Sequence, residues 1–211
     1  LPEERWMAEG IEMADSIVFN PHKWLLTNFD CSAHYVKQPE LLIRTLSILP
    51  EYLKSREQDQ VIDYRDWSVP LGRRFRALKL WFVIRSYGVK GLQKIIRNHI
   101  KLAEYAATWI DEDPEFELVS PRSLSLLNFR FRPKNITKSA DIDLLNEDLL
   151  NRLNDSGRVY FTQNRVRGKF TIRWSIGQTN TQLKHVKNAW SLIKRVSSNL
   201  NQIDSVTINR D

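Results

Sequence analysis

Residues 19–37 read FNPHKWLLTNFDCSAHYVK, and this stretch carries the strongest information about the fold. The apolar run before it, residues 16–19, contains β-branched side chains and predicts a short buried strand. The polar tetrapeptide Asn20-Pro21-His22-Lys23 ends that strand, and apolar character resumes at Trp24. Residues 32–36, SAHYV, predict another short strand. Lys23 therefore follows a strand end in a segment otherwise suited to burial.

The chemistry of Lys23 depends on that burial. Desolvation of an ammonium group favours the neutral amine and lowers its pKa. A neutral amine can attack a carbonyl group and form a Schiff base. The neighbouring Asn20 and His22 could donate hydrogen bonds to an anion such as a cofactor phosphate. On spacing alone, a lysine that extends its ammonium into solvent is the better interpretation, and the residue pattern by itself names no cofactor.

Periodicity in the rest of the chain predicts a second region of mixed helices and strands. Residues 73–88 have apolar side chains at a spacing near 3.6 and predict a helix that ends at Gly88. Residues 1–70 offer too few strands to close a sheet. The later elements that we expect are a helix to about residue 110, strands at 116–120 and 125–132, a helix at 141–157 capped by Asp141, strands at 159–166 and 169–177, and a helix at 181–200. This order predicts an α+β layer with its own core.

Composition limits the classes of protein that are possible. With 211 residues, 42% hydrophobic and 27% charged, the chain matches an ordinary globular protein of one large or two small domains. No apolar run approaches the roughly 18 residues of a membrane span. The single cysteine, Cys31, excludes a disulfide framework within the chain, and the histidines lack metal-ligand spacing, so we expect no metal site. The first ten residues resemble no secretion signal and lack an initiator Met, so we expect a piece of a longer protein.

A formal net charge of +7 makes nucleic acid a candidate partner. The densest basic cluster is Arg73, Arg74, Arg76 and Lys79. No RNA-recognition, KH or zinc-finger pattern accompanies it, and acidic residues are interspersed with the basic ones along the chain. We interpret the cluster as a source of structural ion pairs, and keep nucleic-acid binding as an alternative.

Three stretches closely resemble the aromatic L-amino-acid decarboxylases, which are group II pyridoxal-phosphate-dependent decarboxylases: residues 19–37, 50–103 and 168–190. The resemblance covers roughly residues 5–200. It implies an α/β fold of the fold-type I pyridoxal-phosphate-dependent transferase kind. Residues 1–78 would form the end of the cofactor-binding large domain, and residues 79–211 the small C-terminal α+β domain. It also implies pyridoxal 5'-phosphate as cofactor, an aromatic L-amino acid as substrate, a homodimer and a cytoplasmic location.

The resemblance assigns roles to particular residues. Lys23 resembles the lysine that forms a Schiff base with pyridoxal 5'-phosphate, and Asn20 and His22 match positions beside the cofactor, with His22 near its phosphate. Tyr52 matches the tyrosine of a mobile catalytic loop that protonates the substrate carbon after carbon dioxide leaves. Tyrosine there favours a decarboxylase over the aldehyde-forming relatives. Gly72 matches a position that shapes the substrate pocket.

The chain also departs from the family. Family members are more than twice as long, and no position here matches their ring-stacking residue, their carboxylate at the ring nitrogen or most of their phosphate-binding loop. We therefore expect that these 211 residues alone do not decarboxylate an amino acid. One alternative is a truncated, inactive remnant that acts only by associating with an intact partner.

Overall fold

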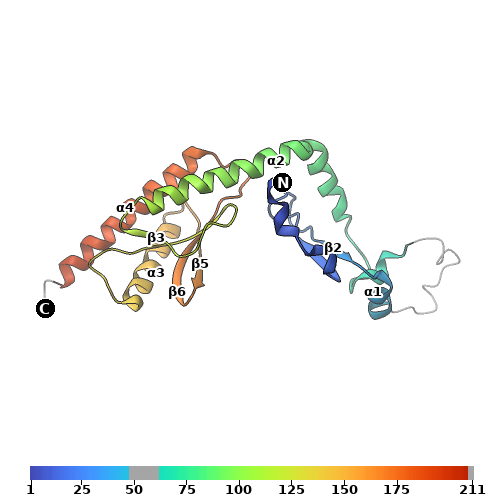
Figure 1. Cartoon of the computed structure of the whole chain (residues 1–211), viewed down its shortest axis with the longest axis horizontal. Coiled ribbons are helices and arrows are strands. Elements are labelled where there is room, and N and C mark those ends of the chain that lie inside the picture. The colour runs from blue at the N-terminus through green and yellow to red at the C-terminus, as the bar shows by residue number, and fades with distance from the viewer. Residues whose placement is uncertain (48–61, 209–211) are drawn as a thin grey trace. The chain divides into compact units, whose positions relative to one another are not determined.

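The computed structural model describes residues 1–47 and 62–208, which form two compact units (Figure 1). The N-terminal unit is Leu1–Gln93 and the C-terminal unit is Lys94–Asp211. The expected assignment of residues 1–78 and 79–211 to two domains of a longer enzyme stays a prediction. Within the described residues, no helix combines the length and the apolar character that a membrane crossing requires.

The N-terminal unit is built around a two-stranded antiparallel hairpin. Strand β1 (Ser16–Phe19) pairs with β2 (Ala33–Val36), with Ser16 opposite Val36 and Phe19 opposite Ala33. Both strands confirm the sequence prediction. The other elements of this unit are 3-10 helices η1 (Pro2–Ala8), η2 (Ile11–Met13) and η4 (Tyr64–Trp67), helix α1 (Pro39–Leu46) and the first part of α2 (Arg76–Asp111).

The prediction that the first strand is buried is wrong. Ser16, Val18 and Phe19 are exposed and Ile17 is only half-buried, because no described element of the N-terminal unit covers these side chains. Exposure of apolar side chains is general in this unit. Among the described residues, all but three of the exposed large apolar or aromatic side chains lie in it. The exceptions are Tyr105, Leu144 and Tyr160.

The C-terminal unit is a four-stranded antiparallel sheet with helices. The strand order is β3-β4-β6-β5. The elements are strands β3 (Phe116–Leu118), β4 (Leu126–Phe131), β5 (Thr162–Val166) and β6 (Lys169–Ser175), with helices α3 (Ser139–Asp155) and α4 (Leu183–Ile208) and the second part of α2. This order of helices and strands is the one that the sequence predicts.

Alternation along the strands places one face of this sheet in the core. Leu127, Phe129 and Phe131 of β4 are fully buried, and they share one hydrophobic cluster with side chains of all three helices. On the opposite face, the paired residues Asn128 and Arg173 are polar. The hydrophobic cluster to which all three helices contribute therefore lies on the face of the sheet that carries Leu127, Phe129 and Phe131.

Two asparagines join helix α3 to neighbouring backbone. Asn146, fully buried, accepts a hydrogen bond from Phe131 N and donates one to Phe131 O, both at 2.7 Å. Asn154 makes the same pair of bonds with Phe161, at 2.8 and 3.0 Å. Each amide thus satisfies both polar groups of one backbone residue, which fixes the register of α3 against these segments.

Three observed helix boundaries can be compared with the boundaries that the sequence predicts. Gly88, with φ 65° and ψ 167°, interrupts α2 as expected, because L residues rarely adopt this conformation. Asp141 does not cap α3: the helix begins at Ser139 after Lys138, so Asp141 lies in the first turn. Helix α4 runs to Ile208, beyond the end expected at residue 200.

Candidate functional site

Lys23 lies in the connection between β1 and β2, residues Asn20–Ser32, which we call the Lys23 loop. The loop begins with a tight turn in which Lys23 N donates to Asn20 O at 2.9 Å. A second bond, from Thr27 N to Pro21 O at 3.2 Å, closes the next part of the loop. Pro21 and Thr27 are buried. Local backbone bonds therefore fix the position of the Lys23 backbone.

His22 joins the two ends of the loop. Its backbone N–H donates to Cys31 O at 3.2 Å. Its ring Nδ1 lies 3.0 Å from Cys31 N and 2.8 Å from Cys31 O, so it accepts from the first when unprotonated and donates to the second when protonated. The ring also meets Phe29 edge-on, with centroids 4.9 Å apart. His22 thus holds the loop through Nδ1 and its backbone.

The side chain of Lys23 is exposed. The prediction of a desolvated amine is therefore wrong for this chain. Pro21 and Thr27 of the same loop are buried, but the described residues leave the Lys23 side chain exposed. Within residues 1–47 and 62–200, no carboxylate forms an ion pair with its ammonium group. The amine is accessible, and it extends from a loop whose backbone is fixed.

Asp30, near the end of the Lys23 loop, is the residue that the sequence analysis missed. Its carboxylate accepts a hydrogen bond from Arg76 Nε at 3.0 Å and lies 3.3 Å from Arg74 Nη2 and 3.9 Å from Lys79 Nζ. The bond from Arg76 and the nearby positive charges hold the pKa of Asp30 below its ordinary value of 3.8, although desolvation opposes the shift. The predicted structural ion pairs of the basic cluster are thereby confirmed for Arg74, Arg76 and Lys79.

The structure describes four of the five predicted site residues, all except Tyr52. Asn20, His22 and Lys23 come together in one turn, with Asn20 and His22 half-buried. Tyr52 lies outside the described residues. Gly72 is exposed, and a Cβ atom added there would meet nothing within 4 Å, so no described residue crowds this position. The roles of all five stay predictions.

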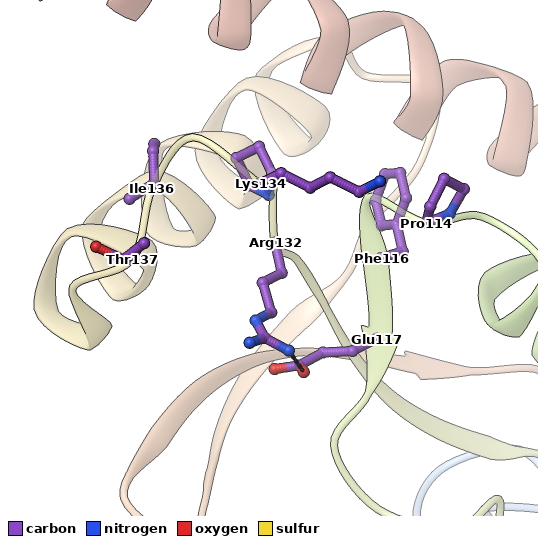
Figure 2. Close-up of a pocket in the computed structure, with 8 residues that line it drawn as sticks. Pro114, Phe116, Glu117, Arg132, Lys134, Ile136 and Thr137 are labelled. Carbon is purple, nitrogen blue, oxygen red and sulfur yellow. Dashed lines mark hydrogen bonds and ion pairs between the residues drawn. The ribbon is translucent and has the colours of Figure 1, made fainter.

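The C-terminal unit contains a surface pocket of about 400 Å³ between β3 and the segment after β4 (Figure 2). Phe116 and Ile136 contribute apolar walls, and the Arg132–Glu117 ion pair, 3.2 Å long, crosses one side. None of the predicted site residues lines this pocket. Among the described side chains, no group of three or more potential metal ligands occurs.

Comparison with known proteins identifies the family. Residues 1–132 match the model of the pyridoxal-dependent decarboxylase conserved domain. The chain is 46% identical over 195 residues to a tryptophan decarboxylase of Camptotheca acuminata, covering 92% of this chain and 39% of that protein. It is 44% identical over 201 residues to a phenylacetaldehyde synthase of Arabidopsis thaliana, covering 94% and 41%. The chain belongs to the pyridoxal-dependent decarboxylase family, whose cofactor is pyridoxal 5'-phosphate.

A solved structure confirms the fold class. The crystal structure of Oryza sativa TDC with PLP and tryptamine matches 94% of this chain with a TM-score of 0.90 and 39% sequence identity, and the match covers 42% of that chain. The present chain thus spans about two fifths of the length of its relatives. The fold is that of fold-type I pyridoxal-phosphate-dependent enzymes, represented here by part of it.

Proposed function

We propose that this chain supplies the cofactor-binding lysine, Lys23, of a decarboxylase that converts an aromatic L-amino acid to its amine, and that it does so as part of a longer protein. One observation carries the proposal: within the family-matching region, Lys23 presents an accessible amine, without an ion pair to the described residues, from a loop fixed by hydrogen bonds.

The chemistry of the side chains around Lys23 fits pyridoxal 5'-phosphate. The cofactor has an aldehyde, for which a primary amine is the required partner, and a phosphate, for which Asn20 and His22 offer hydrogen-bond donors. When bound, its pyridine ring accepts the electron pair left on the substrate carbon as carbon dioxide departs. In this proposal Lys23 holds the cofactor, while Asn20 and His22 orient it.

Two further residues complete the chain's share of the reaction. We propose that the phenol of Tyr52 donates a proton to the substrate carbon, which yields an amine. The chain is also 44% identical to a phenylacetaldehyde synthase, so overall similarity does not distinguish an amine product from an aldehyde product. The proposal of an amine product therefore rests on Tyr52. We propose that Gly72 leaves room for a bulky aromatic ring, in line with relatives named as tryptophan decarboxylases. The homodimer and the cytoplasmic location stay predictions.

Chemical trapping at Lys23 tests the proposal. The longer protein is incubated with pyridoxal 5'-phosphate, reduced with borohydride and mapped by peptide mass spectrometry. We expect a pyridoxyl group on Lys23 and none on Lys37, which is also exposed and lies just past the same hairpin. Equal labelling of Lys23 and Lys37, or labelling that persists on other lysines in place of Lys23, would contradict the assignment.

The remnant hypothesis is tested by activity. If the chain occurs only as a truncated form, we expect no amine from an aromatic amino acid with added cofactor, while the longer protein produces it. Turnover by the isolated 211-residue chain would refute our expectation that the chain alone is inactive. The nucleic-acid alternative loses support, because three of the four residues in the densest basic cluster form ion pairs with Asp30.

A further inference from the structure

Asp30 lies where one carboxylate can connect the Lys23 loop to the start of α2. Its Oδ2 atom accepts the bond from Arg76, the first residue of α2, while its Oδ1 atom faces Arg74 and Lys79. All of these residues belong to the N-terminal unit. Among the described residues, every ion pair of the Lys23 loop passes through Asp30. The carboxylate is therefore the electrostatic link between this loop and the helix.

The next residue extends the link to Lys23. Cys31 is buried, and its Sγ contacts the carbonyl oxygen of Arg76 at 3.8 Å. The backbone of Cys31 bonds in turn to His22, at both the ring Nδ1 and the backbone N–H. His22 immediately precedes Lys23. A continuous series of contacts thus runs from Arg76 through Asp30 and Cys31 to His22 and the cofactor lysine.

We propose that Asp30 is a positioning residue for Lys23: by pairing with Arg76, Arg74 and Lys79 it holds the Lys23 loop in the conformation that presents the amine to the cofactor. The inference rests on the proposed role of Lys23. It follows from the arrangement because only Pro21, Thr27 and Cys31 of the loop are buried, so ion pairs and hydrogen bonds supply much of its constraint. Reactive groups must be held within about 0.5 Å of their productive positions.

The solvent exposure of the Asp30 ion pairs limits how much their loss can change the stability of the fold. Single surface ion pairs contribute little to global stability. Loss of Asp30 should therefore leave the fold intact and change the local opening of the loop. Loss of the Asp30 carboxylate also leaves Arg74, Arg76 and Lys79 close together without their shared counter-charge, so these three cations repel one another beside the Lys23 loop. The expected consequence is local and falls on the Lys23 loop.

The first test measures the loop itself by hydrogen–deuterium exchange of the 211-residue chain. Asp30→Asn should increase exchange of the peptide covering residues 20–31 by about fivefold and leave the peptide of β4 unchanged. Asp148→Asn is the matched control, because its carboxylate also bonds an arginine, Arg152, at 3.0 Å, but on the surface of α3. Unchanged exchange of residues 20–31 in Asp30→Asn would overturn the proposal.

The second test measures the cofactor in the longer protein. Asp30→Asn should speed release of pyridoxal 5'-phosphate about fivefold and shift the pH midpoint of the bound cofactor's absorption band. Asp30→Glu, which keeps the negative charge that faces Arg76, Arg74 and Lys79, should restore both values. Faster loop exchange with an unchanged midpoint and unchanged release would show a structural role only, and would overturn the proposal.

A third variant separates this inference from the proposed function. Lys23→Arg should abolish the absorption band of the bound cofactor. If the band persists in Lys23→Arg, the role of Lys23 is wrong, and the positioning role falls with it. If the band is lost in Lys23→Arg while Asp30→Asn behaves like the unmodified protein, only the inference about Asp30 is wrong.

Discussion

The two units of this chain are stabilised in different ways. In the C-terminal unit, one face of a four-stranded sheet and three helices bury a continuous cluster of aliphatic and aromatic side chains. In the N-terminal unit, the only buried large apolar side chain among the described residues is Leu92, and a polar series of contacts through Asp30, Cys31 and His22 holds the Lys23 loop. The comparison shows that the candidate chemistry lies in the unit with the weaker core.

The largest expected difference between the units comes from a matched pair of phenylalanines. Phe129 is fully buried among Phe116, Phe161 and Trp174, so Phe129→Ala should lower the free energy of unfolding by about 3–5 kcal/mol. Phe19 is 40% exposed, and Phe19→Ala should cost less than about 1.5 kcal/mol. Urea denaturation followed by circular dichroism measures both. Equal losses would contradict the contrast between the units.

A second prediction concerns the polar ties within the C-terminal unit. Asn146→Ala removes the partners of both polar groups of Phe131 and leaves them buried, so we expect a loss of about 3 kcal/mol in the free energy of unfolding. The same denaturation experiment measures it, with the exposed Asn151→Ala as the control expected to change little. A loss no larger than that of the control would mean that water replaces these bonds.

The pH dependence of the C-terminal unit follows from His99. Desolvation lowers the pKa of this buried histidine below its ordinary value of 6.5, although its hydrogen bond with Gln178 O opposes the shift. Below pH 6.5 the unfolded chain binds a proton that the folded chain does not, so stability should fall as pH decreases, by at most about 1.4 kcal/mol per pH unit. Above that pH the contribution is complete.

The control for this prediction is His99→Gln, with unfolding measured between pH 5 and 8. The variant should be less stable than the unmodified chain throughout, and should lose this component of the slope. An identical slope in both proteins would assign the pH dependence to another group.

The smallest expected effect lies in the N-terminal unit at Gly72. A Cβ atom there meets nothing within 4 Å and the backbone does not require glycine, so Gly72→Ser should change the free energy of unfolding of this chain by less than about 0.5 kcal/mol. In the longer protein, the proposed pocket role predicts a reduced kcat/KM for a bulky substrate such as tryptophan. Unchanged preference between tryptophan and tyrosine would remove Gly72 from the pocket.

Sequence patterns predicted the C-terminal unit well because its period-2 and period-3.6 alternation reflects burial within the unit itself. Both strands of the N-terminal hairpin were also predicted. Their exposure was not, because an apolar run such as residues 16–19 indicates that a strand is suited to burial, and does not indicate which segment covers it. The end of α4 was placed too early, although Ile203 and Val206 continue the apolar spacing from Leu200 and could have indicated the extra turns.

The candidate site, like the fold, was predicted only in part from the sequence. The resemblance selected Asn20, His22 and Lys23, and the structure brings them together in one turn. Asp30 was missed because an isolated acidic residue has no motif, and its partners Arg74, Arg76 and Lys79 lie more than forty positions later in the sequence. The available signal was the basic cluster itself, since positive charge at the start of a helix is unfavourable and a carboxylate from elsewhere in the fold relieves it.

The central claim is that the amine of Lys23 holds the cofactor. A crystal structure of the longer protein grown with pyridoxal 5'-phosphate tests it most directly. The account predicts continuous electron density between Nζ of Lys23 and the aldehyde carbon of the cofactor, with Asp30 still paired with Arg76. A cofactor joined to a different lysine, or a Lys23 side chain directed into solvent away from a bound cofactor, would contradict it.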